Sequence, residues 1–372
     1  VLETFLLPCH RVPMVDELPE RARKGRGAVG NPDGRFERQT RVAADDGWGA
    51  PLDEDLPPLR TTLGVDTSRT ILTRNDSPDV PFDRSINPYR GCEHGCVYCF
   101  ARPSHAYLGL SPGLDFESRL FAKPDAAALL RKELARRGYA PAPLAIGTNT
   151  DGYQPIEREW GVTRAVIEVL AETRHPLIVT TKSDRILRDI DLLADMARDN
   201  LVGVAISVTT LDPAVARTLE PRAPHPKRRL AAIRKLIDAG VPTQVNISPI
   251  IPAITDHEIE AIIAAAAAAG AIRASYILLR LPHEVAPLFR AWLDAHYPDR
   301  AAKVMHMVQD IRGGRDNDPD YFSRMKGRGV WAQLIRTRVK RAAREHGMDR
   351  SFPPLRSDLF RPPERDGQME LF

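Results

Sequence analysis

Cysteine is scarce in this sequence. The 372 residues contain four cysteines, and three of them, Cys92, Cys96 and Cys99, fall within eight positions. Secreted domains that depend on disulfides carry an even number of cysteines spread along a short chain, because each thiol needs a partner. Three clustered thiols, with Cys9 far upstream, do not form such a framework. The pattern argues against a disulfide-stabilised extracellular domain and predicts a reducing, cytoplasmic location.

The sequence also lacks an apolar run of the roughly 20 residues needed to cross a bilayer. Its first residues have a short apolar patch and no basic lead-in, unlike a secretory signal peptide. The chain begins with Val1, and Met14 offers a second possible start. With 43% apolar and 27% charged residues, the composition predicts a globular protein without a membrane partner.

The net charge is small, +4, but the basic residues are concentrated in two stretches. Residues 21–42 carry seven Lys and Arg against two acidic residues, and residues 321–350 carry nine against two. Such stretches suit a polyanionic partner, because Lys and Arg that neutralise phosphates release condensed counterions. Binding of DNA or RNA and a simple solvated surface both explain this charge, and the sequence leaves the two open.

Residues 1–70 are rich in Pro, Gly, Asp and Arg and show little hydrophobic periodicity, which predicts a partly ordered N-terminal arm. From Ser85 onward, short apolar runs alternate with helical patterns. The apolar runs predict strands buried on both faces at Ser85–Tyr89, Leu144–Thr148, Leu177–Thr181, Val202–Val208, Thr243–Ser248 and Tyr276–Leu281. The helical patterns, several of which stop at a glycine, predict helices at Asp125–Arg137, Val162–Thr173, Ile186–Arg198, Arg228–Ala239, Asp256–Ala269 and Glu284–His296.

Six strand–helix units in this order predict a parallel sheet with right-handed crossovers. Two units are missing from a full eight, so the predicted fold class is α/β, a partial (βα)6 TIM-type barrel over residues 84–297. Residues 298–350 are predicted to form a helical C-terminal extension, with helices at Ala301–Ile311 and Trp331–His346, and residues 351–372 a flexible tail. Functional residues of such folds gather at the carboxyl ends of the strands. The three cysteines directly follow the first predicted strand, at that edge.

The spacing Cys-x3-Cys-x2-Cys admits three kinds of thiol chemistry. A disulfide would leave one thiol over and would be reduced in a cytoplasm. Structural zinc could use the three cysteines with His94 or His105, although zinc usually takes its ligands from two separated turns. A 4Fe–4S cluster, normally held by four thiolates, would keep one iron without a protein ligand. An open coordination position distinguishes a reactive metal site from a structural one.

A resemblance to a known family rests on motifs beyond the cysteines. The segments NPYRGCEHGCVYCFARP, TNTDGYQPIE, TKS, SVTT, EPRAPHPKRRLAAI and SPIIP follow one another in this order. They resemble the radical SAM superfamily and, within it, the spore photoproduct lyase-like branch, also called DNA repair photolyase-like. The resemblance covers about Arg84 to Gly347. It implies that Cys92, Cys96 and Cys99 hold a 4Fe–4S cluster whose open iron binds S-adenosylmethionine (SAM). On reduction, SAM would be cleaved to methionine and a 5′-deoxyadenosyl radical.

The same resemblance implies contacts to SAM from several strand ends. Tyr98 is expected against the adenine, Lys182 near the SAM carboxylate and Ser207 near the ribose. The other expected contacts are Thr148, Thr150 and Asp151 toward the methionine amine, and Asn246 and Pro249 toward the adenine. Glu220 and Arg222 are expected either to form an ion pair at the rim or to touch the substrate. An electron donor such as flavodoxin or ferredoxin is implied as a partner.

One position departs from the pattern of spore photoproduct lyase. Thr148 stands where that enzyme has the cysteine that returns a hydrogen atom to the product radical, and a threonine O–H is a far poorer hydrogen-atom donor than a thiol. The resemblance therefore extends to SAM cleavage and not to that last step. A damaged nucleic-acid base, a peptide and a small molecule stay open as substrates. A non-enzymatic Fe–S or zinc protein that binds nucleic acid is a further alternative.

Two features near the end of the chain predict a link to nucleic acid that does not depend on the barrel. Gln368–Phe372, QMELF, resembles the short peptide with which bacterial repair and replication proteins bind the sliding clamp. The predicted helix Trp331–His346 carries five basic residues that could clamp a nucleic-acid backbone or simply solvate the helix: Arg336, Arg338, Lys340, Arg341 and Arg344.

Overall fold

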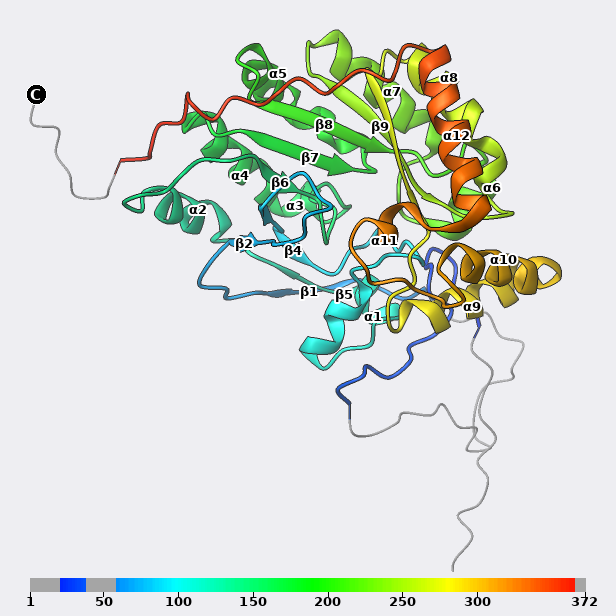
Figure 1. The fold of residues 1–372 in the computed structure, drawn as a ribbon. Helices are drawn as coiled ribbons and strands as arrows, with labels where there is room; N and C mark the ends of the chain where they lie inside the picture. The colour runs from blue at the N-terminus through cyan, green and yellow to red at the C-terminus, as the bar shows by residue number, and fades with distance from the viewer. Residues whose placement is uncertain (1–20, 38–57, 365–372) are drawn as a thin grey trace, which may run out of the picture.

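The computed structural model describes residues 21–37 and 58–364. Its main element is a seven-stranded sheet in the order β10-β9-β8-β7-β6-β3-β2 (Figure 1). Neighbouring strands from β3 to β10 are parallel, and β2 runs antiparallel at one edge. The strands of this sheet are β2 (Leu72–Arg74), β3 (Arg84–Ile86), β6 (Leu144–Ile146), β7 (Leu177–Thr181), β8 (Val202–Ser207), β9 (Thr243–Ile250) and β10 (Arg273–Leu278). A smaller sheet holds β1 (Thr62–Val65), β4 (Tyr89–Arg90) and β5 (Arg119–Ala122).

Helices lie between the strands of the chain and also follow the last strand, β10. They are η1 (Arg102–Leu108), α1 (Leu114–Ser118), α2 (Ala126–Leu134), α3 (Glu157–Trp160), α4 (Val162–Glu172), η2 (Asp184–Asp189), α5 (Ile190–Arg198), α6 (Pro213–Leu219), α7 (Pro226–Asp238), η3 (Asp256–Glu258), α8 (Ile259–Ala268), α9 (Val285–His296), α10 (Pro298–Ile311), α11 (Ser323–Lys326) and α12 (Gly329–Glu345). In the described part of the chain the edge strands β2 and β10 do not pair, so the sheet stays open. The predicted fold class, a partial barrel of six parallel strands, is confirmed. No helix of the described residues has the length and hydrophobicity to span a membrane.

Only the strand Leu177–Thr181 has its predicted bounds, and two of the other five predictions depart furthest from the structure. The predicted strand Ser85–Tyr89 is divided between β3 and β4, which belong to different sheets. The division falls at Pro88, which has no amide hydrogen to donate to a neighbouring strand. The last strand is Arg273–Leu278 and not Tyr276–Leu281, because its pairing with β9 begins where Arg273 lies opposite Gln244.

The expectation that the strands are buried on both faces is wrong for β7 and β9. In β7, Leu177 and Val179 are buried whereas Ile178 and Thr180 are half-buried. β9 alternates in the same way over most of its length. One face of the sheet is therefore covered by the helices, and the other lines the interior of the barrel. Because the barrel is open, that interior is partly accessible to solvent and can receive ligands.

The helix predictions miss η1, α1, α3, α6 and α11, and the structure divides two of the predicted helices. α6 was not expected, although Asp212 accepts hydrogen bonds from the first amides of this helix and Pro213 occupies its first turn, which is a typical helix start. The predicted helices Ile186–Arg198 and Asp256–Ala269 each begin with a separate 3-10 turn, η2 and η3. In the first case Ser183 accepts a hydrogen bond from the Arg185 amide and starts the tighter turn before α5.

Residues 351–364, which fall within the predicted flexible tail, lie against the amino-terminal end of the sheet. The amides of Arg356 and Arg361 donate to the carbonyls of Asn200 (2.9 Å) and Thr173 (2.8 Å). Phe352 packs directly on Gly203, where a Cβ atom would come within 2.1 Å of the Phe352 ring. This segment thus crosses the sheet at the ends opposite to those where the cysteines lie (Figure 1). Gln368–Phe372 and Cys9 lie outside the described residues.

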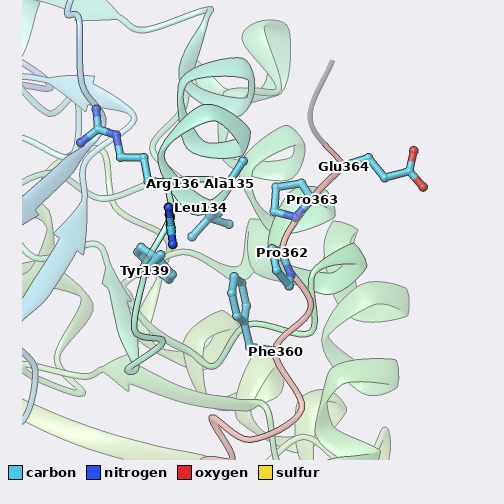
Figure 2. Close-up of a pocket in the computed structure, with 10 residues that line it drawn as sticks. Leu134, Ala135, Arg136, Tyr139, Phe360, Pro362, Pro363 and Glu364 are labelled. Carbon is cyan, nitrogen blue, oxygen red and sulfur yellow. The ribbon is translucent and has the colours of Figure 1, made fainter. Parts of the chain in front are cut away.

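A shallow pocket of about 350 Å³ lies between the end of α2 and this crossing segment (Figure 2). Leu134, Arg136 and Tyr139 line one side, and Phe360 and Pro362 line the other. α2 leads into the amino end of β6, so the pocket is at the end of the barrel away from the cysteines. We therefore do not take it as the candidate functional site.

His175, which lies next to this pocket, makes the free energy of unfolding depend on pH in the acidic range. Its ring is fully buried, lies near Phe360 and faces the Tyr139 hydroxyl at 2.8 Å. Burial lowers the pKa of His175 from 6.5 to about 4. The unfolded chain therefore binds a proton that the folded chain does not, and stability falls as the pH drops from about 6.5 to about 4.

We expect this residue alone to remove about 2–3 kcal/mol of unfolding free energy between pH 7 and pH 4.5. Urea unfolding of the wild type and of His175→Gln at both pH values measures the difference. The variant should lose less stability than the wild type on acidification. An equal loss in the two proteins would contradict a neutral buried histidine.

Candidate functional site

Cys92, Cys96 and Cys99 lie in one loop between β4 and η1, at the end of the barrel where the parallel strands finish. The amide of Cys92 donates to the Phe116 carbonyl (3.0 Å), and the amide after Cys96 donates to the Leu219 carbonyl (3.1 Å). The loop is thus held between α1 and the end of α6. Cys92 and Cys96 are buried and Cys99 is half-buried. The three predicted ligands therefore share one partly enclosed loop.

A buried arginine supports this loop from within. Arg102 has no exposed side-chain surface and donates to the carbonyls of Cys96 (2.9 Å) and Gly95 (3.2 Å). It also donates to the Gly113 carbonyl (2.9 Å) and forms an ion pair with the buried Glu117 carboxylate. A buried charge is tolerated when it is paired and its hydrogen-bonding groups are satisfied. Arg102 therefore fixes the backbone that carries the cysteines.

The N-terminal arm closes over the same loop. The amides of Gly27 and Ala28 donate to the two oxygens of Glu117 at 2.9 and 2.8 Å. At Gly27 an added Cβ atom would lie 1.9 Å from the Gly95 carbonyl oxygen, so only glycine allows this approach. Further along the arm, Arg35 forms an ion pair with Glu284 at the start of α9 (3.0 Å). Gly27 and Ala28, in the arm expected to be only partly ordered, thus contact the cysteine loop and its supporting carboxylate.

The segment that follows β6, residues 148–154, contacts the cysteine loop and the residues before it from the opposite side. The Asn87 side-chain oxygen accepts from the Thr148 hydroxyl (3.3 Å) and the Thr150 amide (3.4 Å). The Thr150 hydroxyl donates to the Tyr89 carbonyl (3.1 Å). Gln154 accepts from the Glu93 amide at 2.8 Å, inside the cysteine loop. These contacts join the ends of β3 and β6 to the cysteines.

Asp151 links β6 to β7. Its carboxylate accepts from the Thr181 hydroxyl (2.7 Å), the Tyr153 amide (2.9 Å) and the Lys182 amide (2.8 Å), and it faces His94 Nδ1 at 3.3 Å. Burial raises the pKa of Asp151, but His94, Thr181 and the Lys182 amide together bring it well below its ordinary value. The ionised carboxylate therefore fixes the backbone of Lys182.

The Lys182 ammonium lies inside the site without an anionic partner. Its Nζ is 5.7 Å from the centre of the Tyr98 ring, and no hydrogen bond or ion pair to another described residue satisfies it. Burial lowers the pKa of Lys182, but Cys96 and Glu220 raise it above its ordinary value overall. Lys182 is half-buried, and an ammonium that stays charged while partly removed from water is stabilised by an anion. The position therefore suits a carboxylate ligand.

Tyr98 is held by a buried charge cluster. Its hydroxyl donates to Glu220, which also accepts from Thr209 (2.7 Å) and forms an ion pair with Arg229. Burial raises the pKa of Glu220, but Arg229 and Lys182 lower it to about 2. Of the two roles expected for Glu220 and Arg222, the ion pair between them is not formed, because Glu220 pairs with Arg229. Glu220 turns inward to α7, and a sequence motif gives no information on which of two nearby arginines it meets.

Arg222 instead pairs with Glu93 inside the cysteine loop, at 3.0 Å. The Glu93 carboxylate also accepts from the Thr61 hydroxyl at 2.6 Å. The EPRAP segment and the residues before β1 thus both contact the loop.

The remaining predicted contacts occupy the ends of β8 and β9. Ser207 is buried, and its carbonyl accepts from Arg229 at 3.2 Å. The Asn246 side-chain oxygen accepts from the Ser275 hydroxyl on β10. Pro249 follows a cis peptide bond in β9. These residues share the carboxyl-terminal half of the sheet with Lys182, but no direct contact joins Asn246 or Pro249 to the cysteines in the described structure.

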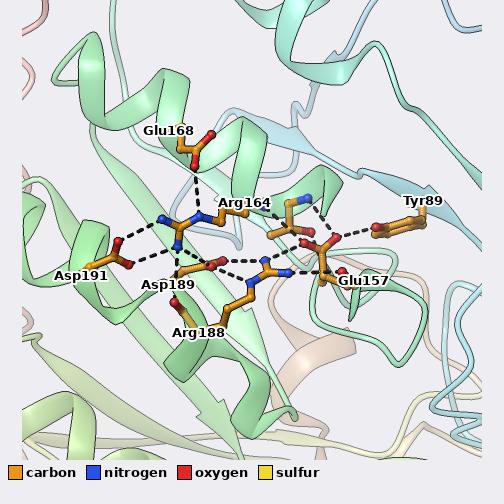
Figure 3. A network of polar contacts seen from close by, with 9 residues as sticks. Tyr89, Glu157, Arg164, Glu168, Arg188, Asp189 and Asp191 are labelled. Carbon is orange, nitrogen blue, oxygen red and sulfur yellow. Dashed lines mark hydrogen bonds and ion pairs between the residues drawn. The ribbon is translucent and has the colours of Figure 1, made fainter. Parts of the chain in front are cut away.

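A second polar network stabilises the segment just before the cysteine loop (Figure 3). The Tyr89 hydroxyl donates to Glu157, which also accepts from Arg188 at 2.7 Å. Arg188 pairs with Asp189 (2.7 Å), and Asp189 pairs with Arg164 (3.1 Å). Glu157 and Asp189 are buried, and each has a cationic partner. The network fixes Tyr89 relative to α3, α4 and η2.

The two histidines considered as zinc ligands, His94 and His105, are both buried near the cysteine loop. His94 Nδ1 faces Asp151 at 3.3 Å and His105 Nε2 lies 2.9 Å from the Arg119 carbonyl, while the Nδ1 atoms of both rings are buried without a hydrogen-bond partner. In the described residues no three Cys, His, Asp or Glu side chains, the three cysteines included, already converge as the ligands of one ion do. Burial raises the pKa of the Cys96 thiol to about 12 and that of Cys92 well above its ordinary value. A bound metal centre would be needed to keep such thiols deprotonated.

Sequence reasoning missed the residues that hold the loop. Arg102, Glu117, Gln154 and Arg229 are all buried, although charged and amide side chains are usually exposed. The sequence gives a partial indication that Glu117 is buried, since Leu114, Phe116 and Leu120 lie close to it in GLDFESRL. Its partners, however, come from positions far away in the sequence.

Comparison with known proteins defines the class to which this fold and site belong. The family model described as the radical SAM superfamily matches residues 86–266. An uncharacterized protein of Mycobacterium tuberculosis (strain H37Rv) is 35% identical over 251 residues, which is 67% of this chain and 73% of that protein. The chain belongs to the radical SAM superfamily.

More distant similarities agree with this assignment. An uncharacterized protein of Methanocaldococcus jannaschii is 27% identical over 173 residues, 46% of this chain and 62% of that protein. The solved structure of spore photoproduct lyase complexed with dinucleoside spore photoproduct has a TM-score of 0.53 and 18% identity, covering 76% of this chain and 78% of that one. At this identity the comparison concerns the fold, and the partial barrel of this chain is similar to that of spore photoproduct lyase.

Proposed function

We propose that this protein is an enzyme that holds a 4Fe–4S cluster on Cys92, Cys96 and Cys99 and cleaves SAM reductively. The observation that carries the proposal is the buried loop with three thiols beside the unpaired Lys182 ammonium. A reduced cluster held by these cysteines would supply the electron for cleavage of the SAM sulfonium to methionine and a 5′-deoxyadenosyl radical, which would take a hydrogen atom from the substrate.

The residues of this chain would bind and orient SAM. Lys182 supplies a positive charge for the SAM carboxylate, and Asp151 holds the backbone of Lys182 in place. Glu220 and Arg229 fix Tyr98 beside the site. Thr148, Thr150, Ser207, Asn246 and Pro249 remain proposed contacts to SAM.

The role of Lys182 is testable with Lys182→Met. The substitution keeps much of the side-chain volume and removes the charge, so we expect the KM for SAM to rise by about tenfold to a hundredfold, as for a lost charge-assisted hydrogen bond. Initial rates of 5′-deoxyadenosine formation measure the change. Lys132→Met, an exposed lysine on α2, is the matched control. An unchanged KM in Lys182→Met, with iron content equal to the wild type, would contradict this role.

A spectroscopic experiment tests the proposal as a whole. We expect anaerobically reconstituted protein to be brown, to contain about four irons and four sulfides per chain and to give a 4Fe–4S electron paramagnetic resonance signal after reduction with dithionite. SAM should change the shape of that signal, because it binds the iron that lacks a cysteine. A colourless protein that retains stoichiometric zinc would refute the proposal.

Nucleic acid is the substrate class that we infer, with a peptide or a small molecule as the alternatives. Two arginines of α12 are engaged, Arg338 with Glu260 and Arg341 with Glu345. Three other basic residues of this helix form no ion pair with another described residue: Arg336, Lys340 and Arg344. A flavodoxin or ferredoxin as electron donor, sliding-clamp binding by Gln368–Phe372 and a cytoplasmic location are further parts of the proposal.

A further inference from the structure

Arg280 occupies the mouth of the barrel immediately after β10. Its guanidinium lies 5.4 Å from the centre of the Phe100 ring, and Phe100 directly follows Cys99 in the sequence. On the other side, Arg280 Nη1 lies 3.7 Å from the sulfur of Met325 in α11. Arg280 thus bridges the cysteine loop and the C-terminal extension.

Arg280 lacks the partners that its neighbours have. Arg324 forms an ion pair with Asp79, and the buried Arg312 donates to the carbonyls of Leu278 and Leu279. Arg280 Nε, by contrast, is buried without a hydrogen-bond partner, and no carboxylate of the described residues pairs with this guanidinium. Burial and Arg324 lower the pKa of Arg280. A guanidinium so placed favours an anionic ligand that supplies two acceptor oxygens.

Exposed aromatic rings lie on the two segments that Arg280 contacts, the cysteine loop and the loop that leads to Met325. Phe100, Tyr321 and Phe322 are 45%, 52% and 64% exposed, although large aromatic residues are usually buried. The Arg324 guanidinium lies 4.8 Å from the centre of the Tyr321 ring. The loop that carries the last two rings runs directly into Met325, the contact of Arg280.

Phe322 is held outward in an unfavourable backbone conformation. Its φ is +65°, a region that a bulky L-residue rarely adopts. The Phe322 amide donates to Asp79 Oδ2 at 3.0 Å, and the same carboxylate pairs with Arg324. The surrounding contacts therefore fix the strained residue and display its ring to solvent. Strain of this kind gathers at ligand-binding sites.

We propose that Arg280, Phe100 and the loop 321–325 form the substrate-recognition surface and bind one nucleotide unit of single-stranded nucleic acid. The phosphate lies at the Arg280 guanidinium, and the base stacks on the exposed rings. Stacking on aromatic side chains together with cationic contacts to the backbone is the usual way in which proteins hold single strands. The inference deepens the proposed function, on which it rests for the nature of the substrate.

The test uses the reconstituted holoenzyme with fluorescein-labelled dT12, rU12 and an acidic peptide of equal charge as probes. Fluorescence anisotropy measures the dissociation constants. We expect binding of a single-stranded oligonucleotide to weaken by about tenfold or more in Arg280→Gln. We expect a loss of at least about fivefold in Phe322→Gly, which removes the ring. Glycine is unstrained at this φ, so the second variant separates loss of the ring from loss of folding.

Arg198→Gln, at the far end of α5, removes the same charge from the opposite end of the barrel and should change binding less than about twofold. Equal affinity of the wild type and Arg280→Gln for both oligonucleotides would overturn the inference. So would a preference for the acidic peptide. These results are distinguishable from failure of the proposed function, which would appear in the wild type as absence of the cluster and of SAM cleavage.

Discussion

Cys96→Ala is expected to abolish both the 4Fe–4S cluster and the cleavage of SAM. Two remaining thiols would leave two irons without a protein ligand, and a cluster held in this way is not retained. The backbone of the loop should survive the change, because Arg102 binds the carbonyl of Cys96 and not its thiol. The expected result is loss of bound iron to background and of 5′-deoxyadenosine formation by at least about a thousandfold, without loss of the fold.

Cys9→Ala is the matched control, since it replaces the fourth cysteine of the chain. Iron content, sulfide content and product formation should equal those of the wild type. Circular dichroism of both variants reports the fold. Cys96→Ala protein that still carries four irons and forms 5′-deoxyadenosine would show that the ligand assignment is wrong.

Arg102→Met is expected to have the largest effect on stability. The side chain is fully buried and binds Glu117 as well as the carbonyls of Gly95, Cys96 and Gly113. Removing one partner of a buried ion pair leaves the other charge uncompensated, which destabilises by about 3–5 kcal/mol. We expect a loss of that size in urea unfolding. Cluster content after reconstitution should fall with it, because the same guanidinium shapes the cysteine loop.

Arg119→Met is the control for this experiment. Arg119 is half-exposed and lies 3.7 Å from Asp115, so its removal should change the free energy of unfolding by less than about 1 kcal/mol. If Arg102→Met were as stable as Arg119→Met, the buried network would not be what holds the loop.

The features that could be predicted from the sequence are those that depend on residues close together along the chain. The β7 range Leu177–Thr181 was predicted as it is observed, because a short apolar run there is bounded by helical segments. Gly240 and Gly270 follow α7 and α8 with φ of +81° and +90°, as expected of glycines that end helices. The cysteine spacing likewise depends on neighbours in sequence, and the predicted ligands share one loop.

Features that depend on distant partners could not be predicted. The partner of Glu117 in the arm is Gly27, 90 positions away, and the arm has no hydrophobic periodicity that would signal such packing. Glu220 forms its ion pair with Arg229 and not with Arg222 because of the way in which α6 and α7 pack. The half-buried face of β9 follows from the open barrel, which leaves residues such as Asn246 exposed to the interior.

The most direct test of the central claim is product analysis with the reconstituted, dithionite-reduced wild type and SAM under anaerobic conditions. The account predicts that 5′-deoxyadenosine and methionine form together in a ratio of about one to one, because a single C–S bond is broken. It also predicts that both products disappear in Cys96→Ala. A protein that carries a full cluster and binds SAM, yet forms neither product on reduction, would contradict the account.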